Sequence, residues 1–384
     1  MAKAADLTKR YLDEAGIGYF GLPNGPISRF VPEKYFFRRV MRECINYQKK
    51  EGKVECRACF HFCKIAEGKT GLCGVRQNRS GKLFLLTYNK AIAVHIDPIE
   101  KKPLFHFLPG SYAYSLGTLG CNLRCANCQN FDISQMFGQK GKIENYAKLN
   151  WGLDLTPEQI VEKALENNCQ SIAYTYNEPT IFWEYALDTM KLARKRGLKN
   201  VWVSNGFMSS QTLDAIIPYL DAINVDIKSF DDQFYKTNCG ARLDPILENC
   251  RRLVKEKVWL EITTLIIPTL SDEERMLEKI ACFIKEELGD FVPWHVSAFS
   301  GAISWKLKFL PDTPILKIKK ASALGKEAGL KYVYAGNIWE ENLVNTYCPQ
   351  CDEVVIKRVG YVTERFDQNG KCPNCGKILE GVFN

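Results

Sequence analysis

The sequence contains no long apolar segment and no block of like charge. None of its apolar runs approaches the roughly 18 residues that a membrane-spanning helix needs. Its first residues, MAKAADLTKRYLDE, are charged almost at once and include no apolar signal region. We therefore expect a cytoplasmic protein without a membrane partner. The net charge of +8 is spread over the chain, and the basic pieces 191–199 and 317–320 have the pattern of solvated helix faces, so charge alone gives no reason to expect a nucleic-acid partner.

The sequence also has no secretory signal that would predict disulfide bonds, although cysteine is abundant. Sixteen cysteines in a chain without a secretory signal argue against a disulfide framework. Eleven of the cysteines fall into three tight groups. The remaining five are predicted to be small buried apolar residues, and they are Cys44, Cys169, Cys239, Cys250 and Cys282.

With 46% apolar and 25% charged residues, the 384-residue chain has the composition of a globular protein, with one large α/β domain plus small appendages or two medium domains. Helical patterns cover 156–167, which begins with an N-cap threonine and a first-turn proline, and 182–196, which ends before Gly197. The expected strands are 113–118, 171–176, 200–204, 222–226, 259–265, 294–297 and 331–334. This alternation predicts right-handed βαβ units around a parallel sheet.

Polar side chains follow almost every one of these expected strands. They are Asn177-Glu178, Ser204-Asn205, Asp226 with Lys228, Thr263-Thr264, His295 with Ser297, and Asn337. The carboxyl ends of barrel strands converge on one face that carries the active site, so the pattern favours a full or partial (β/α) barrel over an open doubly wound sheet. We predict three parts: a cap over residues 1–110, a barrel over 111–342, and a small module over 343–384. The cap is expected to be helical over residues 1 to about 50 and cysteine-rich after that, with hairpins near 83–87 and 91–96.

The segment after the first barrel strand carries Cys121, Cys125 and Cys128, spaced Cys-x3-Cys-x2-Cys with no evident fourth ligand nearby. Three thiolates on one loop can hold three irons of a [4Fe–4S] cluster and leave the fourth iron open. An open coordination position is typical of a catalytic site, and soft sulfur ligands select iron–sulfur or zinc. A three-thiolate zinc site completed by a distant residue and plain buried cysteines are the alternatives.

This spacing at the end of a first barrel strand resembles the signature of the radical SAM (S-adenosylmethionine) superfamily, in its branch of pyruvate formate-lyase-activating-enzyme-like proteins. The Gly-Gly-Glu-Pro element of that branch is replaced here by Tyr176-Asn177-Glu178-Pro179, which keeps Glu-Pro and lacks both glycines. Later elements of the branch are similar to Ser204-Asn205-Gly206, Asp226-Ile227-Lys228 and Pro293-Trp294-His295.

The resemblance implies a partial (β/α)6-type radical SAM barrel, with a [4Fe–4S] cluster and SAM as cofactors. It implies that Glu178 holds the methionine ammonium of SAM by a charge-assisted hydrogen bond, although Glu178 also fits an acid that complements a helix dipole. The residues implied to orient the rest of SAM are Asn205, Asp226, Lys228 and His295. A donor of ferredoxin or flavodoxin type would supply the electron for reductive SAM cleavage, and the resulting 5′-deoxyadenosyl radical would abstract hydrogen from an unidentified substrate.

A narrower resemblance rests on three stretches of the sequence. The segments 97–111 (DPIEKKPLFHFLPGS), 174–179 (YTYNEP) and 332–337 (YVYAGN) are similar to the AmmeMemoRadiSam system radical SAM proteins. The similarity covers the chain from about residue 55 to its end. It implies Memo-like and AMMECR-like proteins as partners and does not supply a substrate.

Two further cysteine groups flank the central one. Near the C-terminus, two Cys-x2-Cys knuckles have the spacing of a zinc ribbon, with a strand expected over 354–363, and a rubredoxin-like iron is the alternative metal. These knuckles are Cys348, Cys351, Cys372 and Cys375. Nearer the N-terminus lie Cys56, Cys59, Cys63 and Cys73, for which a structural zinc, an auxiliary [4Fe–4S] cluster and a buried cysteine patch remain open, in that order. His61, inside that group, is expected to be a packed side chain.

Two other functions remain open from the sequence. A glycyl-radical-enzyme activase would use the same cluster chemistry on a partner protein. A zinc-ribbon nucleic-acid-binding protein would use its central cysteines only as structural ligands.

Overall fold

The computed structural model describes residues 41–136 and 152–384, which all belong to one compact unit, Val40–Asn384. The helical pattern expected for the first forty residues lies outside these ranges. For residues 41–50 the expected helix is wrong, because the chain forms the strands β1 (Arg42–Glu43) and β2 (Tyr47–Lys50) there. Pairing with later strands of the cap decides this conformation, since strand formation depends strongly on tertiary context.

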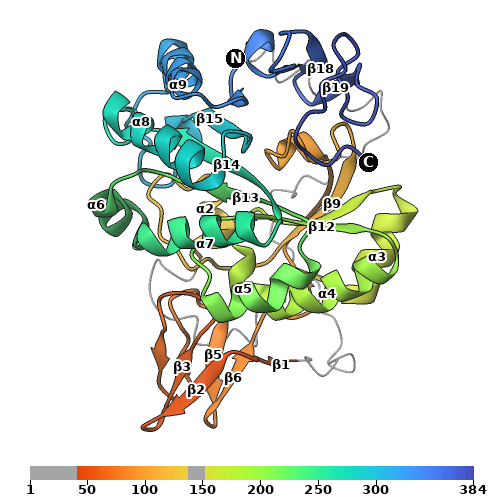
Figure 1. The fold of residues 1–384 in the computed structure, drawn as a ribbon. Coiled ribbons are helices and arrows are strands. Elements are labelled where there is room, and N and C mark those ends of the chain that lie inside the picture. Colours follow the sequence, from red (N-terminus) through yellow and green to blue (C-terminus); the bar gives the residue numbers. More distant parts are fainter. Residues whose placement is uncertain (1–40, 137–151) are drawn as a thin grey trace, which may run out of the picture. The chain divides into compact units, whose positions relative to one another are not determined.

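An eight-stranded sheet forms the centre of the molecule (Figure 1). Seven parallel strands lie side by side in chain order: β9 (Tyr112–Gly117), β11 (Ser171–Tyr174), β12 (Lys199–Ser204), β13 (Ala222–Asp226), β14 (Trp259–Ile266), β15 (Trp294–Ala298) and β16 (Val333–Gly336). At one edge, β8 (Ala93–Pro98) pairs with β9 in the antiparallel sense. All seven predicted strands are therefore confirmed, one more than the (β/α)6-type barrel that the resemblance implied. Within the described residues β8 and β16 do not pair with each other, so the sheet is open.

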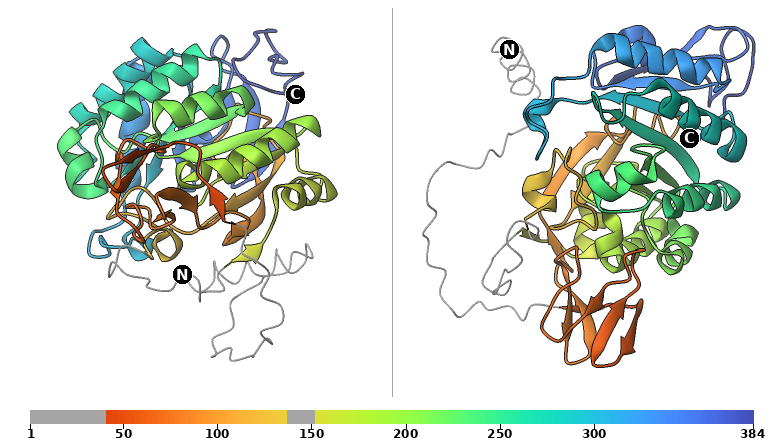
Figure 2. Two further views of the ribbon diagram at one scale, coloured as in Figure 1. Left: turned by 90° about the horizontal axis from the view of Figure 1, so that it is seen from below. Right: turned by 90° about the vertical axis from the view of Figure 1, so that its left-hand side faces the viewer.

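Helices cover one face of this sheet (Figures 1 and 2). The longer ones are α3 (Pro157–Glu166), α4 (Trp183–Lys195), α5 (Ser210–Ile216), α7 (Asp244–Lys255), α8 (Glu274–Phe283) and α9 (Ile315–Glu327). Right-handed crossovers between sequential parallel strands place every connecting helix on the same side. The predicted start of α3 is confirmed, because Thr156 Oγ1 accepts from Gln159 N while Gln159 Oε1 accepts from Thr156 N, which completes a capping box.

Shorter helical turns shape the loops at the sheet's two ends. The short α-helices are α2 (Phe131–Ser134) and α6 (Asp232–Phe234), and the 3-10 turns are η2 (Ile99–Lys101), η4 (Pro179–Phe182), η5 (Ile217–Tyr219), η8 (Gly301–Ile303) and η9 (Glu341–Leu343). Two π-helical turns, η6 (Tyr235–Cys239) and η7 (Ile284–Leu288), extend α6 and α8. Within the two described ranges we find no helix long and apolar enough to cross a bilayer.

The cap consists of small antiparallel sheets near the carboxyl ends of the parallel strands. Its remaining strands are β3 (Lys53–Cys56), β4 (Lys64–Ile65), β5 (Arg76–Arg79), β6 (Lys82–Leu85) and β7 (Lys90–Ala91), the last paired with β10 (Leu153–Asp154). The expected run 83–87 is β6, whereas 91–96 belongs mainly to β8 and joins the central sheet. A buried ion pair between Arg76 and Glu184 of α4 fixes the cap to the sheet's helical layer.

The C-terminal module lies at the opposite, amino ends of the strands. It contains β17 (Thr346–Tyr347), β18 (Val354–Val359) and β19 (Val362–Arg365). The single strand expected over 354–363 is in fact a hairpin, because the chain turns at Gly360, whose φ is +60°. Leu108 N donates to Val382 O at 2.6 Å, and Val382 N donates to His106 O at 2.7 Å, so the segment 99–110 joins the module to the sheet.

Candidate active site

Segment 121–128 forms a loop at the carboxyl end of β9, and neighbouring loops hold its backbone. From the loop after β11, Asn177 Nδ2 donates to the carbonyl oxygen of Gly120 at 2.7 Å. From the loop after β15, Lys306 N donates to Ala126 O at 2.8 Å. Because parallel strands end together, loops distant in sequence meet here.

The three predicted ligands of this loop are buried or half-buried thiols. Burial raises the pKa of the Cys121 thiol, and the nearby Glu178 carboxylate raises it further. Ser134 Oγ lies 3.2 Å from Cys128 Sγ. Metals bind thiolates, and a bound metal supplies the positive charge that buried thiols need to ionise, so this donor set fits a soft metal centre.

Glu178 lies where β11 leads into η4, and its side chain is buried. Its Oε1 accepts from Thr180 N (3.0 Å) and Ser204 Oγ (2.9 Å), and its Oε2 accepts from Asn205 N (2.7 Å). Burial raises the pKa of this carboxyl, while the hydrogen bonds oppose the shift. Glu178 therefore caps the N-terminus of η4, in agreement with its alternative role as an acid that complements a helix dipole. It also connects the loops that follow β11 and β12. Among the described residues Oε2 has one partner, so it retains a lone pair for a ligand.

Asn205 connects Glu178 to the cysteine loop. Its Nδ2 donates to Asn122 Oδ1 at 2.8 Å, and its Oδ1 accepts from Phe207 N at 3.0 Å. Asn122 immediately follows the first cysteine of the triplet. The structure thus brings three of the predicted site segments into direct hydrogen-bonded contact.

Tyr176 stands where the family element has a glycine, and its backbone adopts a left-handed conformation. Its φ is +69°, in the left-handed region that favours glycine. Its hydroxyl donates to Asp97 Oδ2 at 2.5 Å, and the Lys102 ammonium lies 4.9 Å from its ring centroid. Lys102 Nζ also bonds Asp97 Oδ2 at 2.5 Å. These contacts hold the strained residue, so the turn before Asn177 is kept without glycine.

Asp226 and Lys228 form an ion pair at the end of β13, with Asp226 Oδ2 and Lys228 Nζ 2.7 Å apart. Burial alone would lower the pKa of Lys228, but Asp226, Cys125 and Cys239 together raise it well above its usual value. Opposite Asp226 in the sheet register lies Thr263, whose Oγ1 is buried and has no hydrogen-bond partner among the described residues. Sequence analysis noted Thr263 among the polar strand ends but did not place it in the site.

His295 is the neighbour of Thr263 in the sheet register, but its side chain bonds elsewhere. Its Nε2 is 2.6 Å from Glu261 Oε2, and its ring packs edge-on against Phe105 at 4.7 Å between centroids. Glu261 in turn accepts from the backbone amides of Phe105 and His106. No hydrogen bond within the described residues joins His295 to the cysteine loop. The structure therefore places His295 in a buried network with the segment 99–110.

Cys239 is a neighbour of the triplet that sequence analysis assigned only to the core. It ends η6, its carbonyl accepts from Arg124 N at 2.8 Å, and its thiol hydrogen-bonds that of Cys125. This bond raises the pKa of Cys125 and lowers that of Cys239. More than a hundred residues separate the two cysteines, so no local spacing could reveal the contact.

The other scattered cysteines follow the prediction with one exception. Cys44, Cys169, Cys239 and Cys250 are buried, whereas Cys282 is exposed, so the prediction is wrong for Cys282. Cys282 lies on the outer face of α8, where a helical position between two buried residues points to solvent.

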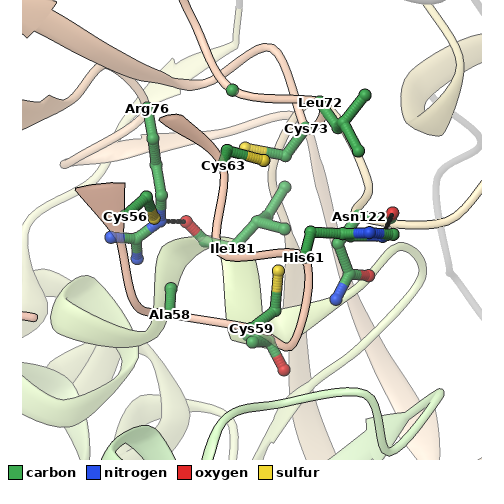
Figure 3. A pocket seen from close by; sticks show the side chains of 12 residues that line it. Cys56, Ala58, Cys59, His61, Cys63, Leu72, Cys73, Arg76, Asn122 and Ile181 are labelled. Carbon is green, nitrogen blue, oxygen red and sulfur yellow. Dashed lines mark hydrogen bonds between the residues drawn. The ribbon is translucent and has the colours of Figure 1, made fainter. Parts of the chain in front are cut away.

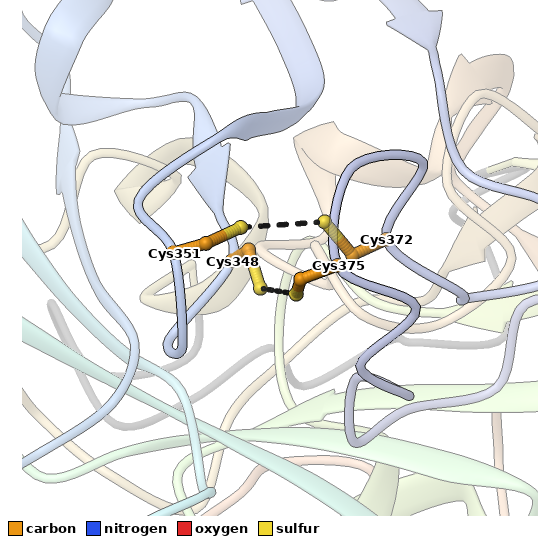
Figure 4. Close-up of side chains that lie close together, drawn as sticks. All are labelled: Cys348, Cys351, Cys372 and Cys375. Atoms are coloured by element: carbon orange, nitrogen blue, oxygen red, sulfur yellow. Dashed lines mark hydrogen bonds between the residues drawn. The ribbon is translucent and has the colours of Figure 1, made fainter.

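The C-terminal knuckles bring their four thiols together (Figure 4). Cys348 Sγ lies 3.5 Å from Cys375 Sγ, and Cys351 Sγ lies 3.7 Å from Cys372 Sγ. All four sulfur atoms lie within 4.8 Å of one another. A tetrahedral zinc with bonds of 2.3 Å holds its sulfurs about 3.8 Å apart, so this geometry fits one zinc ion.

The N-terminal cysteines line a cavity beside the triplet (Figure 3). Cys56 ends β3, Cys59 and Cys63 lie on the loop between β3 and β4, and Cys73 lies on the loop before β5. His61 also borders the cavity, but its Nε2 is engaged 2.8 Å from Asn122 O and its ring packs on Phe207. His61 is a packed side chain, as expected.

Comparison with known proteins agrees with this geometry. The sequence pattern of the radical SAM superfamily matches residues 116–280. The uncharacterized protein MJ0808 of Methanocaldococcus jannaschii is 40% identical over 347 residues, which are 89% of this chain and 100% of that protein. The pyruvate formate-lyase-activating enzyme of Clostridium pasteurianum is 28% identical over 189 residues, 46% of this chain and 72% of that enzyme.

Among solved structures, a radical SAM methyltransferase from Sphaerobacter thermophilus is similar to this chain with a TM-score of 0.46 and 13% identity, covering 60% of this chain and 67% of that one. The family match over residues 116–280 and the similarity to activating enzymes identify an enzyme of the radical SAM class. The chain belongs to the radical SAM superfamily.

Proposed function

We propose that Cys121, Cys125 and Cys128 hold a [4Fe–4S] cluster and that SAM binds beside it. The observation that carries this proposal is the hydrogen-bonded chain from Glu178 through Asn205 to Asn122, which connects the cysteine loop to the predicted SAM residues. When bound, the cluster and SAM supply one electron and a 5′-deoxyadenosyl radical that removes hydrogen from the substrate.

The remaining site residues position SAM and exclude water. Glu178 Oε2 accepts a hydrogen bond from the methionine ammonium, and Asn205 keeps Glu178 aligned with the cysteine loop. Asp226 and Lys228 orient the nucleoside part, and opposite Asp226 lies the Thr263 hydroxyl, which has no hydrogen-bond partner within the described part of the chain. A buried site protects radical chemistry from solvent.

The segment 97–111 supports the AmmeMemoRadiSam system as the narrower assignment, because it is the longest stretch of that resemblance. Asp97 of this segment accepts a hydrogen bond from Tyr176, which lies in the second stretch of the resemblance. On this assignment the protein works in the cytoplasm with Memo-like and AMMECR-like partners. A donor of ferredoxin or flavodoxin type supplies the electron.

A second candidate is a glycyl-radical-enzyme activase. The name of the Clostridium pasteurianum relative, an activating enzyme for pyruvate formate-lyase, favours it. In that case the hydrogen is taken from a protein. The family assignment makes the chain an enzyme and favours both candidates over a zinc-ribbon nucleic-acid-binding protein.

The C-terminal module is proposed to hold a structural zinc. Its four thiols have the spacing of one tetrahedral ion, and the module contacts the amino ends of the strands, away from the cysteine loop. The three parts 1–110, 111–342 and 343–384 remain our proposal for the division of the chain.

The decisive experiment measures 5′-deoxyadenosine after anaerobic incubation with SAM and dithionite. Cys125→Ala should abolish the product, because the cluster loses one of three anchors. Cys250→Ala, at an equally buried cysteine of α7, should retain it. Full production by Cys125→Ala would contradict the proposal. Mass spectrometry of added Memo-like and AMMECR-like proteins and of a glycyl-radical enzyme then separates the two candidates.

A further inference from the structure

The N-terminal cysteine group has features of a metal centre that the proposed function does not use. Cys56, Cys59, Cys63 and Cys73 line one hollow of about 340 Å³, including its open mouth. Soft sulfur donors gathered around one hollow select iron–sulfur or zinc over hard cations.

The spread of these thiols separates them from the C-terminal knuckles. Among the described residues, only the C-terminal group has three or more ligand atoms within 4.8 Å of one another. One zinc ion would require sulfurs about 3.8 Å apart. The sulfur atoms of the four N-terminal cysteines therefore surround a hollow but are not gathered at the spacing that a single zinc ion needs. The sulfur atoms of the central triplet are not gathered at that spacing either. A cubane binds each thiolate to a different iron corner and so needs the wider arrangement.

The hollow adjoins the central cysteine loop directly. A Cβ at Gly120, whose φ is +89°, would collide with the carbonyl oxygen of Cys73. The Arg124 guanidinium donates to Leu72 O, and Asn122 lines the hollow itself. The backbones of Gly120 and Cys73 are thus in contact. Gly120 directly precedes the predicted ligand Cys121, and Cys73 is itself a predicted ligand. Electron tunnelling falls steeply with distance, so such contact suits electron exchange.

We propose that Cys56, Cys59, Cys63 and Cys73 hold a second [4Fe–4S] cluster that passes electrons, one at a time, to the cluster on the central loop. Four thiolates leave no open iron, so this cluster carries electrons and does not bind SAM. In each cycle a ferredoxin- or flavodoxin-type donor is oxidised by one electron, the second cluster is reduced, and it is reoxidised as the central cluster takes the electron. No bond or proton is transferred. The transfer step rests on the proposed function, whereas the metal site does not.

The first test measures iron, sulfide and zinc in the full-length protein after anaerobic reconstitution. The wild type should hold about eight irons per chain, as expected for two [4Fe–4S] clusters. A variant with Cys121, Cys125 and Cys128 replaced by alanine leaves the N-terminal group intact. It should retain about four irons and, when reduced, give an electron paramagnetic resonance signal that SAM does not change.

The complementary variant replaces Cys59 and Cys63 by alanine. It should retain the signal that SAM perturbs and should lose the other one. Cys44→Ala, at a buried cysteine outside the group, is the matched control and should retain both signals. A triplet variant that holds zinc in place of iron, or holds no metal beyond the C-terminal module, overturns the proposal even if the double variant misfolds.

The transfer step is tested by 5′-deoxyadenosine formation in the double variant with two reductants. With reduced flavodoxin the rate should fall several-fold relative to the Cys44→Ala control, and with dithionite it should be unchanged. Equal rates with flavodoxin would overturn the relay. Absence of any SAM-perturbed signal in the wild type would instead sink the proposed function and leave the second cluster standing.

Discussion

Tyr176 shows how a single side chain can replace the freedom of glycine. A left-handed φ at a non-glycine residue costs on the order of 1 kcal/mol or more. The phenol–Asp97 bond and the adjacent Lys102 ammonium offset that cost. Burial raises the pKa of Tyr176, and Asp97 raises it further, so the phenol remains a donor at neutral pH.

Tyr176→Phe removes this hydroxyl and retains the ring. A hydrogen bond to a charged group contributes about 1.5–3 kcal/mol, so the free energy of unfolding should fall by that amount. Because the turn positions Asn177 and Glu178, SAM should also bind more weakly. Denaturant titration and SAM titration measured by electron paramagnetic resonance report the two effects.

Tyr112→Phe provides the control, since Tyr112 is exposed. Its stability and SAM affinity should match the wild type. An unchanged unfolding free energy in Tyr176→Phe would show that the phenol does not compensate the backbone strain.

Single residues were predictable where a motif fixed their position on the chain. The motif singled out Glu178 and Asn205, and the structure joins them by a hydrogen bond, while their role toward SAM stays a prediction. Cys239 and the Tyr176–Asp97 bond were not found, because their partners lie 79 or more residues away and only the folded sheet brings them together. For His295 the motif did not reveal the hydrogen bond to Glu261, and its predicted role toward SAM stays a prediction.

At the scale of elements, the segment 99–110 connects the sheet to the C-terminal module through His106. His106 Nδ1 lies 2.7 Å from Glu380 O, and Nε2 lies 2.6 Å from Tyr334 OH. These partners fit a neutral ring that donates from Nδ1 and accepts at Nε2. Burial lowers the pKa of His106 to about 4, while Glu261 opposes the shift.

This histidine should make the protein's stability depend on pH. The unfolded chain binds a proton near pH 6.5 and the folded chain only near pH 4, so stability falls as pH decreases through this window. Between pH 7 and pH 5 the loss should be about 2 kcal/mol. Unfolding free energies at the two pH values measure it.

His106→Gln should show a smaller loss between the same two pH values, because the titrating group is gone. His95→Gln, at an exposed histidine, should keep the wild-type pH dependence. Any contribution of the C-terminal thiols to the pH dependence should be the same in both variants as in the wild type. An identical pH dependence in His106→Gln would assign the effect to other groups.

The C-terminal module should depend on its metal without affecting the central loop. Replacing Cys372 and Cys375 by alanine should release about one zinc per chain and increase hydrogen exchange across residues 343–384, because structural zinc sites contribute folding energy directly. Iron content should stay at the wild-type level. Loss of iron with unchanged zinc would show that the tail binds iron.

Elements were predicted best where a local signal coincided with the tertiary environment. The capping box of α3 and the C-terminal end of α4 are examples. The hairpin at Gly360 was missed because both of its strands carry β-forming residues and only the turn separates them. The strands at 41–50 were missed because their partners lie later in the chain.

At the scale of the whole molecule, the cap and the sheet share one hydrophobic core. That core runs from Cys44 in the cap to Ala335 in β16. The predicted boundary near residue 110 therefore separates stretches of sequence that pack together. Alternating patterns of strand and helix predicted the sheet, because its parallel strands lie side by side in the order in which they occur in the sequence. They could not predict how the cap closes over it.

The cap's contacts also set an order of events during synthesis. Cys59 bridges to Met208, and Phe60 N donates to Phe207 O, so the cap's partners are made more than a hundred residues after it. At 5–20 residues per second, the ribosome needs roughly 7 to 30 seconds to reach them. Through that interval four reactive thiols stay uncovered in the nascent chain. A cell that makes this protein must keep them reduced before the hollow that surrounds them exists.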